Sequence, residues 1–142
     1  MATQMTYLLD TDSASLASER HKRVLSRIQQ VPTANIWLSS IVAEESLRGT
    51  LNVISRNRDK PGLPGAYDFL GRLLRFIGQY PILTYDDYAA QILASFSPSV
   101  KRVGSQDCRI AARVVSRCWI VVTANQKDFS RRPGIQFEDW SR

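Results

Sequence analysis

Short apolar runs alternate with longer stretches of helical periodicity along this chain of 142 residues. Each helical stretch repeats apolar side chains every three or four positions, as a helix with one buried face does. The alternation predicts an α/β fold with a mostly parallel central sheet flanked by helices, because parallel strands are joined by helical crossovers. The predicted strands cover residues 5–9, 35–38, 81–84, 119–123 and 135–137.

Capping residues and helix breakers set the expected bounds of the helices. The predicted helices run from the first strand to about Gln30, from Ser39 or Ser40 to about Ser55, from Phe69 to Gly78, from Asp86 or Asp87 to Pro98, and onward from Ser105. Residues 56–65 hold two Pro and two Gly among charges and are expected to form a loop. The length fits one domain, which we place at residues 1–142.

The chain is basic, with 19 Lys and Arg against 13 Asp and Glu and a formal net charge of +6. This charge is compatible with simple solubility, and also with a polyanionic partner whose phosphates release counterions on binding. Several cations cluster, at residues 20–23, 56–60, 101–102 and 131–132. The charge alone does not decide between the two explanations.

The two cysteines, Cys108 and Cys118, match no zinc motif and are too few for a disulfide framework. No apolar run approaches the roughly 18 residues that a membrane-spanning helix needs, and no signal peptide is recognised at the start of the sequence. We therefore expect a cytoplasmic protein without a membrane partner.

Four acids occupy positions from which they could meet: Asp10, Glu45, Asp107 and Asp128. The carboxyl ends of parallel strands share one edge of a sheet, where ligands of open α/β sheets bind. Two carboxylates about 4 Å apart repel by roughly 4 kcal/mol at an effective dielectric of 20, so converging acids require a cation, a basic partner or shared protons. A hard cation such as Mg²⁺, which takes oxygen ligands, would satisfy this requirement.

Three of these acids also have simpler explanations. Asp10 follows a strand and could cap a helix, although Asp12 is the better cap candidate. Asp107 fits the first turn of a helix, where the dipole favours negative charge. Asp128 lies in a polar loop, where a single acid is usually solvated.

Glu45 lies inside an apolar helical pattern, on the same face as Ile41 and Val42. Burying a carboxylate there is costly unless it is paired or bound to a metal, although it could also reach solvent. Glu44 points about 100° away around the helix and is expected to be solvated.

Other chemistries lack their residues. The only histidine, His21, lies in a basic helical stretch, so a Ser/His/Asp triad and a histidine zinc site have no support. The sequence also contains neither of the common glycine-rich phosphate loops.

Four segments resemble, in order and spacing, the signature blocks of PIN domains, most closely VapC-type toxins of bacterial type II toxin–antitoxin pairs. They are Tyr7–Asp12, Leu38–Gly49, Gly104–Ala112 and Val122–Phe129. The segments 81–90 and 129–140 are also similar to that subfamily, so the resemblance covers nearly the whole chain.

The resemblance implies an endoribonuclease dependent on Mg²⁺ or Mn²⁺, with Asp10, Glu45 and Asp107 as metal ligands and catalytic acids. Asp128 is a further catalytic candidate, and Thr123 would orient a ligand or water. Many PIN domains have a fourth acid where this chain has Asn125, which we assign a supporting role.

The resemblance also implies partners. They are an RNA substrate, a second copy of the chain in a homodimer, and a cognate antitoxin whose tail enters the acidic cleft. Arg109 and Lys127 are the first candidates for holding the RNA backbone, and the helical stripes 47–54 and 69–77 are possible dimer faces.

Two other functions are compatible with parts of the pattern. A PIN-like module that binds nucleic acid or a partner without cutting is favoured by the missing acid at Asn125. A phospho-receiver domain would need an acceptor Asp at the end of its third strand, but Leu83 is followed by Thr84 and Tyr85. Chelation by EDTA separates cutting from binding.

Overall fold

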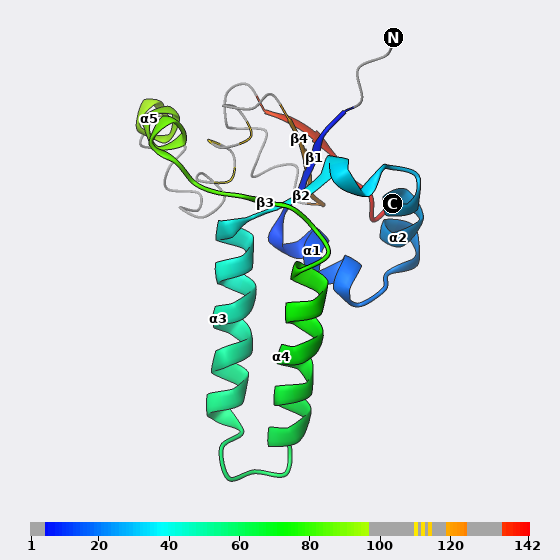
Figure 1. Ribbon diagram of the computed structural model, residues 1–142, viewed down its shortest axis with the longest axis vertical. Coiled ribbons are helices and arrows are strands. Elements are labelled where there is room, and N and C mark those ends of the chain that lie inside the picture. The colour runs from blue at the N-terminus through cyan, green and yellow to red at the C-terminus, as the bar shows by residue number, and fades with distance from the viewer. Residues whose placement is uncertain (1–4, 97–109, 111, 113, 115–118, 125–134) are drawn as a thin grey trace.

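A five-stranded, all-parallel sheet forms the centre of the protein, in the strand order β3-β2-β1-β4-β5 (Figure 1). The structure, a computed structural model, describes residues 5–96, 110, 112, 114, 119–124 and 135–142. The strands are β1 (Tyr7–Leu9), β2 (Ile36–Ser39), β3 (Ile82–Leu83), β4 (Ile120–Val122) and β5 (Gln136–Glu138). The prediction of an α/β fold with a mostly parallel sheet is confirmed.

The central strands are apolar on both faces, as parallel strands covered by helices are. Leu8 and Leu9 of β1 are fully buried, and so are Val121 and Val122 of β4. Leu9 pairs in register with Val122, and the next amide, Asp10 N–H, donates to the carbonyl of Val122 at 3.1 Å. This register places the residues that follow β1 and β4 side by side at the carboxyl edge.

The described helices are α1 (Thr11–Ser18), α2 (Lys22–Gln29), α3 (Ser40–Arg56), α4 (Leu63–Ile77) and α5 (Asp87–Ser95), with a 3₁₀ turn at Thr33–Asn35. Ser39 caps α3 and Asp86 caps α5, as expected.

The single helix predicted up to Gln30 is wrong, because the chain breaks between α1 and α2. Arg20 adopts a left-handed φ of 63°, and His21 then caps α2 by accepting a hydrogen bond from Val24 N–H at 3.4 Å. A cap formed by His Nδ1 gives no strong sequence signal, since Ser, Thr, Asp and Asn are the usual capping residues.

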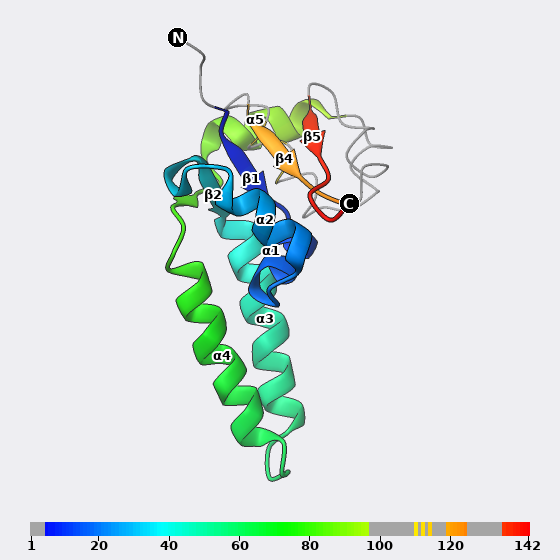
Figure 2. The same ribbon diagram turned by 90° about the vertical axis from the view of Figure 1, so that its right-hand side faces the viewer.

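Helices α3 and α4 form an antiparallel hairpin that projects well beyond the sheet (Figures 1 and 2). We call residues 46–75 the arm. Helix α4 begins at Leu63, earlier than predicted, because Pro64 lies in its first turn, where a missing N–H costs nothing. The expected loop is therefore confined to residues 57–62.

The core lies between the sheet and its covering helices. It includes the described residues Ile110, Ala112 and Val114, which are helical and buried, whereas the rest of the helix predicted from Ser105 lies outside the described residues. Near the C-terminus, Trp140 is buried against Tyr7, with ring centroids 5.1 Å apart. None of the described helices is long and apolar enough to cross a membrane.

Candidate active site

Asp10 lies directly after β1 and is only 4% exposed. Its Oδ1 accepts a hydrogen bond from Ser13 N–H at 2.7 Å, so Asp10 is the N-cap of α1. The expectation that Asp12 is the better cap is wrong: Asp12 lies inside the first turn of α1, two residues after the cap, and is exposed. Capping does not exclude a second task, since a carboxylate has two oxygens and about four acceptor positions.

Burial raises the pKa of the Asp10 carboxyl above its ordinary value. Hydrogen bonds from Thr123 and Ser13 act in the opposite direction, and the nearby charge of Asp12 adds to the rise. The net direction shows that this environment disfavours the charged form, because desolvation outweighs the hydrogen bonds. A positive charge placed beside Asp10 would relieve that cost.

Thr123 follows β4 and is completely buried. Its N–H donates to the carbonyl of Glu138 at 2.9 Å, which fixes its position against β5. Its side chain hydrogen-bonds to Asp10. Thr123 is therefore in direct contact with one of the predicted acids, and its supporting role stays a prediction.

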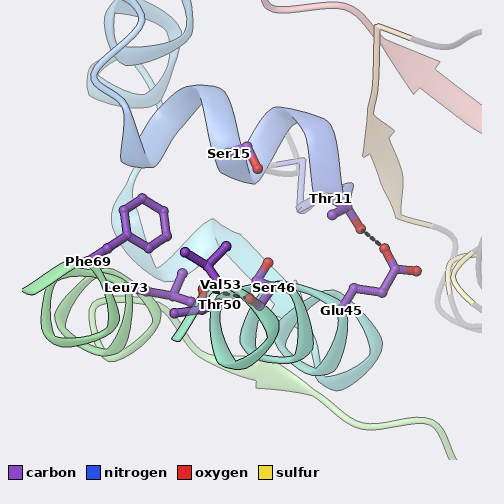
Figure 3. Close-up of a pocket in the computed structure, with 9 residues that line it drawn as sticks. Thr11, Ser15, Glu45, Ser46, Thr50, Val53, Phe69 and Leu73 are labelled. Carbon is purple, nitrogen blue, oxygen red and sulfur yellow. Dashed lines mark hydrogen bonds between the residues drawn. The ribbon is translucent and has the colours of Figure 1, made fainter. Parts of the chain in front are cut away.

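Glu45 extends from α3 toward the start of α1. The hydroxyl of Thr11 donates to Glu45 Oε2 at 2.7 Å, across 34 residues of sequence (Figure 3). Thr11 follows Asp10 directly, so this hydrogen bond brings Glu45 to the same edge of the sheet. Among the described residues, Glu45 makes no other hydrogen bond, which leaves Oε1 available to a ligand.

Glu44 behaves as expected. Its side chain is 50% exposed and pairs with Arg48 one turn along α3 at 2.7 Å. An exposed pair of this kind contributes little to stability. The two neighbouring glutamates therefore point in different directions from α3, and Glu45 is the one that faces α1.

A groove of about 360 Å³ begins at Thr11 and Glu45 and continues along the arm (Figure 3). Its remaining lining residues come from α1, α3 and α4: Ser15, Ser46, Gly49, Thr50, Val53, Phe69 and Leu73. The wall is polar at the end that holds Glu45 and apolar toward Phe69. A Cβ added at Gly49 would meet nothing within 4 Å, so the groove is open there.

Five of the predicted site residues lie outside the described residues: Asp107, Arg109, Asn125, Lys127 and Asp128. Within the described part of the chain, no group of three or more His, Cys, Asp or Glu side chains could hold a metal ion. The described acids, Asp10 and Glu45, therefore form only part of the predicted set.

Two curated relatives and the solved structures agree with one another. The tRNA(fMet)-specific endonuclease VapC of Salmonella typhimurium is 29% identical over 140 residues, covering 96% of this chain and 98% of that protein. The protein of the same name from Shigella flexneri is 39% identical over 70 residues, covering 46% of this chain and 53% of that protein. The VapBC structure from Salmonella typhimurium, which is bound to DNA, superimposes with a TM-score of 0.77 at 27% identity, covering 96% of this chain and 99% of that one. The resemblance to VapC-type toxins is confirmed.

The VapC-like fold is also found at lower identity. FitAcB from Neisseria gonorrhoeae gives a TM-score of 0.78 at 21% identity, covering 96% of this chain and all of that chain. No family model matches the chain. The family likeness therefore depends on whole-chain similarity to individual VapC proteins.

The described donors of this VapC-like chain fit a hard divalent cation. They are carboxylate oxygens, and Asp10 is buried with a raised pKa, which an adjacent cation would lower again. Thr123 and Thr11 orient the two carboxylates from outside, as hydrogen-bonding partners of metal ligands commonly do.

Thr11 was not among the site residues predicted from the sequence. A threonine after a strand-ending aspartate usually only begins a helix, and no spacing rule connects it with a residue on α3. The only available signal was its position between Asp10 and Asp12 in the first signature segment.

Proposed function

We propose that this chain is a metal-dependent endoribonuclease of the toxin–antitoxin kind, formed by a single domain over residues 1–142. The observation that carries the proposal is the hydrogen bond from Thr11 to Glu45, which brings an acid of α3 to the buried Asp10 that follows β1. The VapC relatives, which are named as tRNA(fMet)-specific endonucleases, support RNA as the substrate and tRNA as the first candidate.

In this proposal Asp10 and Glu45, together with Asp107 and with Asp128 or Asn125, hold Mg²⁺ or Mn²⁺. The cation, when bound, activates water and stabilises the charge that develops on the phosphate. Asp10 supplies a carboxylate whose direction is fixed by Ser13 and Thr123, and Glu45 supplies one that is fixed by Thr11. Arg109 and Lys127 remain candidates for holding the phosphate backbone.

We also propose the partners of this domain. A cognate antitoxin would silence the enzyme by covering the end of the groove at Glu45, and the solved VapBC structures support a partner of this type. A homodimer would bury the outer face of the arm and the adjoining part of β3, where a second groove of about 650 Å³ includes Leu47, Leu51, Ile77 and Ile82 among its lining residues. Exposed apolar surface of this kind commonly marks an interface.

The experiment that tests the proposal compares the wild type with Asp10→Asn on tRNA(fMet). Asparagine retains the helix cap but removes the anionic ligand, so the variant should fold and lose Mg²⁺-dependent cleavage. EDTA should stop cleavage by the wild type and leave RNA binding in place. Cleavage by Asp10→Asn at the wild-type rate would contradict the proposed site, whereas binding without any metal-dependent cleavage would favour a non-catalytic module.

A further inference from the structure

The arm carries most of the excess positive charge of the chain. Residues 46–75 contain six basic and two acidic residues, a net charge of +4 out of +6 for the whole protein. Three of the six, Arg56, Arg58 and Lys60, gather where α3 ends and the loop to α4 begins, and all three are exposed. We call these three residues the basic tip.

The basic tip makes no ion pair among the described residues. Arg48 and Arg72 of the arm pair with Glu44 and Asp68, whereas no acid in the described part of the chain lies within ion-pair distance of Arg56, Arg58 or Lys60. Like charges placed together repel, and the repulsion is relieved when an anion binds between them. The tip is therefore available to a polyanion.

The groove extends from the candidate active site along α3 as far as Val53, less than one helical turn before Arg56 of the basic tip. One face of α3 carries, at intervals of three or four positions, Glu45, Gly49, Val53 and Arg56. From Glu45 to Arg56 the helix rises by roughly 16 Å. A ligand that touches both ends must therefore be extended and several units long.

An exposed aromatic ring lies between the two ends. Phe69 of α4 lines the groove and is 43% exposed, and the guanidinium of Arg72 lies 5.7 Å from its ring centroid. Unstacked RNA bases bind to aromatic rings and to arginine planes, and basic grooves follow the backbone. If Phe69 served only to pack the interior, its ring would be buried instead of exposed.

We infer that single-stranded RNA binds along this groove, with its phosphates at the basic tip and one base against Phe69. The strand then enters the candidate active site from the side of the arm. This inference rests on the proposed function, because it names the path by which that substrate reaches Glu45. An antitoxin covering the groove would compete with RNA for the same surface.

The test measures RNA binding without cleavage. A labelled single-stranded RNA of roughly twelve nucleotides, within the range of about 4–16 that single-strand grooves cover, is titrated in EDTA at several salt concentrations. The tip variant is Arg56→Gln/Arg58→Gln/Lys60→Gln. The matched control is Arg20→Gln/Lys22→Gln/Arg23→Gln, which removes the same charge from exposed positions in the turn before α2 and at the start of α2.

The tip variant should lower the slope of log affinity against log salt by about 2, since each contact with a single-strand phosphate contributes about 0.7. The control should retain most of the wild-type slope. Equal losses of slope in both triple variants would overturn the inference, because net charge alone would then explain binding. A tip variant that binds RNA with wild-type affinity would also overturn it.

Phe69 gives an independent measurement. Phe69→Ala should weaken RNA binding by about tenfold, and Phe69→Tyr, which keeps a ring for stacking, should restore it. If Ala and Tyr behave alike, no base contacts this ring and the inference is wrong. A wild type that binds RNA through the tip but does not cut it with Mg²⁺ would refute the proposed nuclease function and leave this inference intact.

Discussion

The carboxyl edge of the sheet and the arm are built on opposite principles. At the edge, polar side chains are buried: Asp10 is 4% exposed and Thr123 not at all, and each has hydrogen-bond partners. On the arm, large apolar side chains are exposed, with Leu51 at 53% and Leu74 at 52%. Neither arrangement follows from stability alone. Burying a carboxylate costs free energy of folding, and a leucine left exposed gains little from burial.

The difference fits the proposed division of the molecule into a catalytic edge and a recognition surface on the arm. A buried, hydrogen-bonded carboxylate is held in one geometry, which favours binding of a cation or a reacting group. An exposed apolar and basic surface is suited to a partner that covers it. We therefore expect changes at the edge to affect cleavage most, and changes on the arm to affect binding and assembly.

The largest expected effect separates two neighbouring glutamates. Glu45→Gln should reduce metal-dependent cleavage by more than about 100-fold, beyond the ~10–100-fold loss typical of residues that only orient metal ligands. Glu44→Gln should change it less than twofold, because the exposed pair with Arg48 contributes little. The measurement compares initial rates of tRNA cleavage by the two variants and the wild type at saturating Mg²⁺. Similar losses in both variants would show that Glu45 has no special position.

The next effect concerns Thr11, which touches Glu45 from the neighbouring helix. Thr11→Val keeps the shape but removes the donor, so Glu45 should lose its orientation and Mn²⁺ affinity should fall about tenfold. Thr11→Ser should restore most of the affinity. Calorimetric Mn²⁺ titration of the protein without RNA measures this directly, and equal affinity in the Val and Ser variants would exclude the role.

Most of the fold could be predicted from the sequence, because it depends on patterns that extend over many residues. The five strands and the caps at Ser39 and Asp86 follow from periodicity and local hydrogen bonding. The break at Arg20 and the cap at His21 did not, since a left-handed arginine and a histidine cap have no distinctive pattern.

The candidate site could be predicted only in part. Asp10 and Glu45 are recognisable one by one from strand ends and helix faces. Their connection through Thr11 depends on how α1 packs against α3, which is a tertiary contact across 34 residues. Asp12 was wrongly preferred as the cap because the register of the first helical turn is set by where β1 ends.

A smaller effect is expected on the pH dependence of stability, and it arises from Asp10 at the carboxyl edge of the sheet. The pKa of Asp10 is raised in the fold, so the folded protein binds more protons than the unfolded chain above the ordinary carboxyl pKa of 3.8. Stability in the absence of metal should therefore fall as pH rises from 3.8 through the folded pKa. Asp10→Asn keeps the cap and lacks this penalty.

Thermal unfolding in EDTA tests the sign. At pH 7 the melting temperature of Asp10→Asn should exceed that of the wild type by a few degrees, and the difference should shrink toward pH 4. A variant less stable than the wild type at pH 7 would mean that the charged carboxylate is satisfied by the protein alone. The edge would then not need a cation.

The smallest effect on folding is expected on the outer face of the arm. Leu51→Ser should change the free energy of unfolding of the monomer by no more than about 0.5 kcal/mol, as surface substitutions usually do, because Leu51 is 53% exposed. The buried Leu9→Ala should cost about 2–5 kcal/mol of that free energy.

Light scattering should nevertheless show that Leu51→Ser weakens the proposed homodimer, because Leu51 lines the groove between α3 and β3. A dimer of unchanged affinity would place that interface elsewhere, and a large loss of monomer stability would show that the arm belongs to the core rather than to a partner.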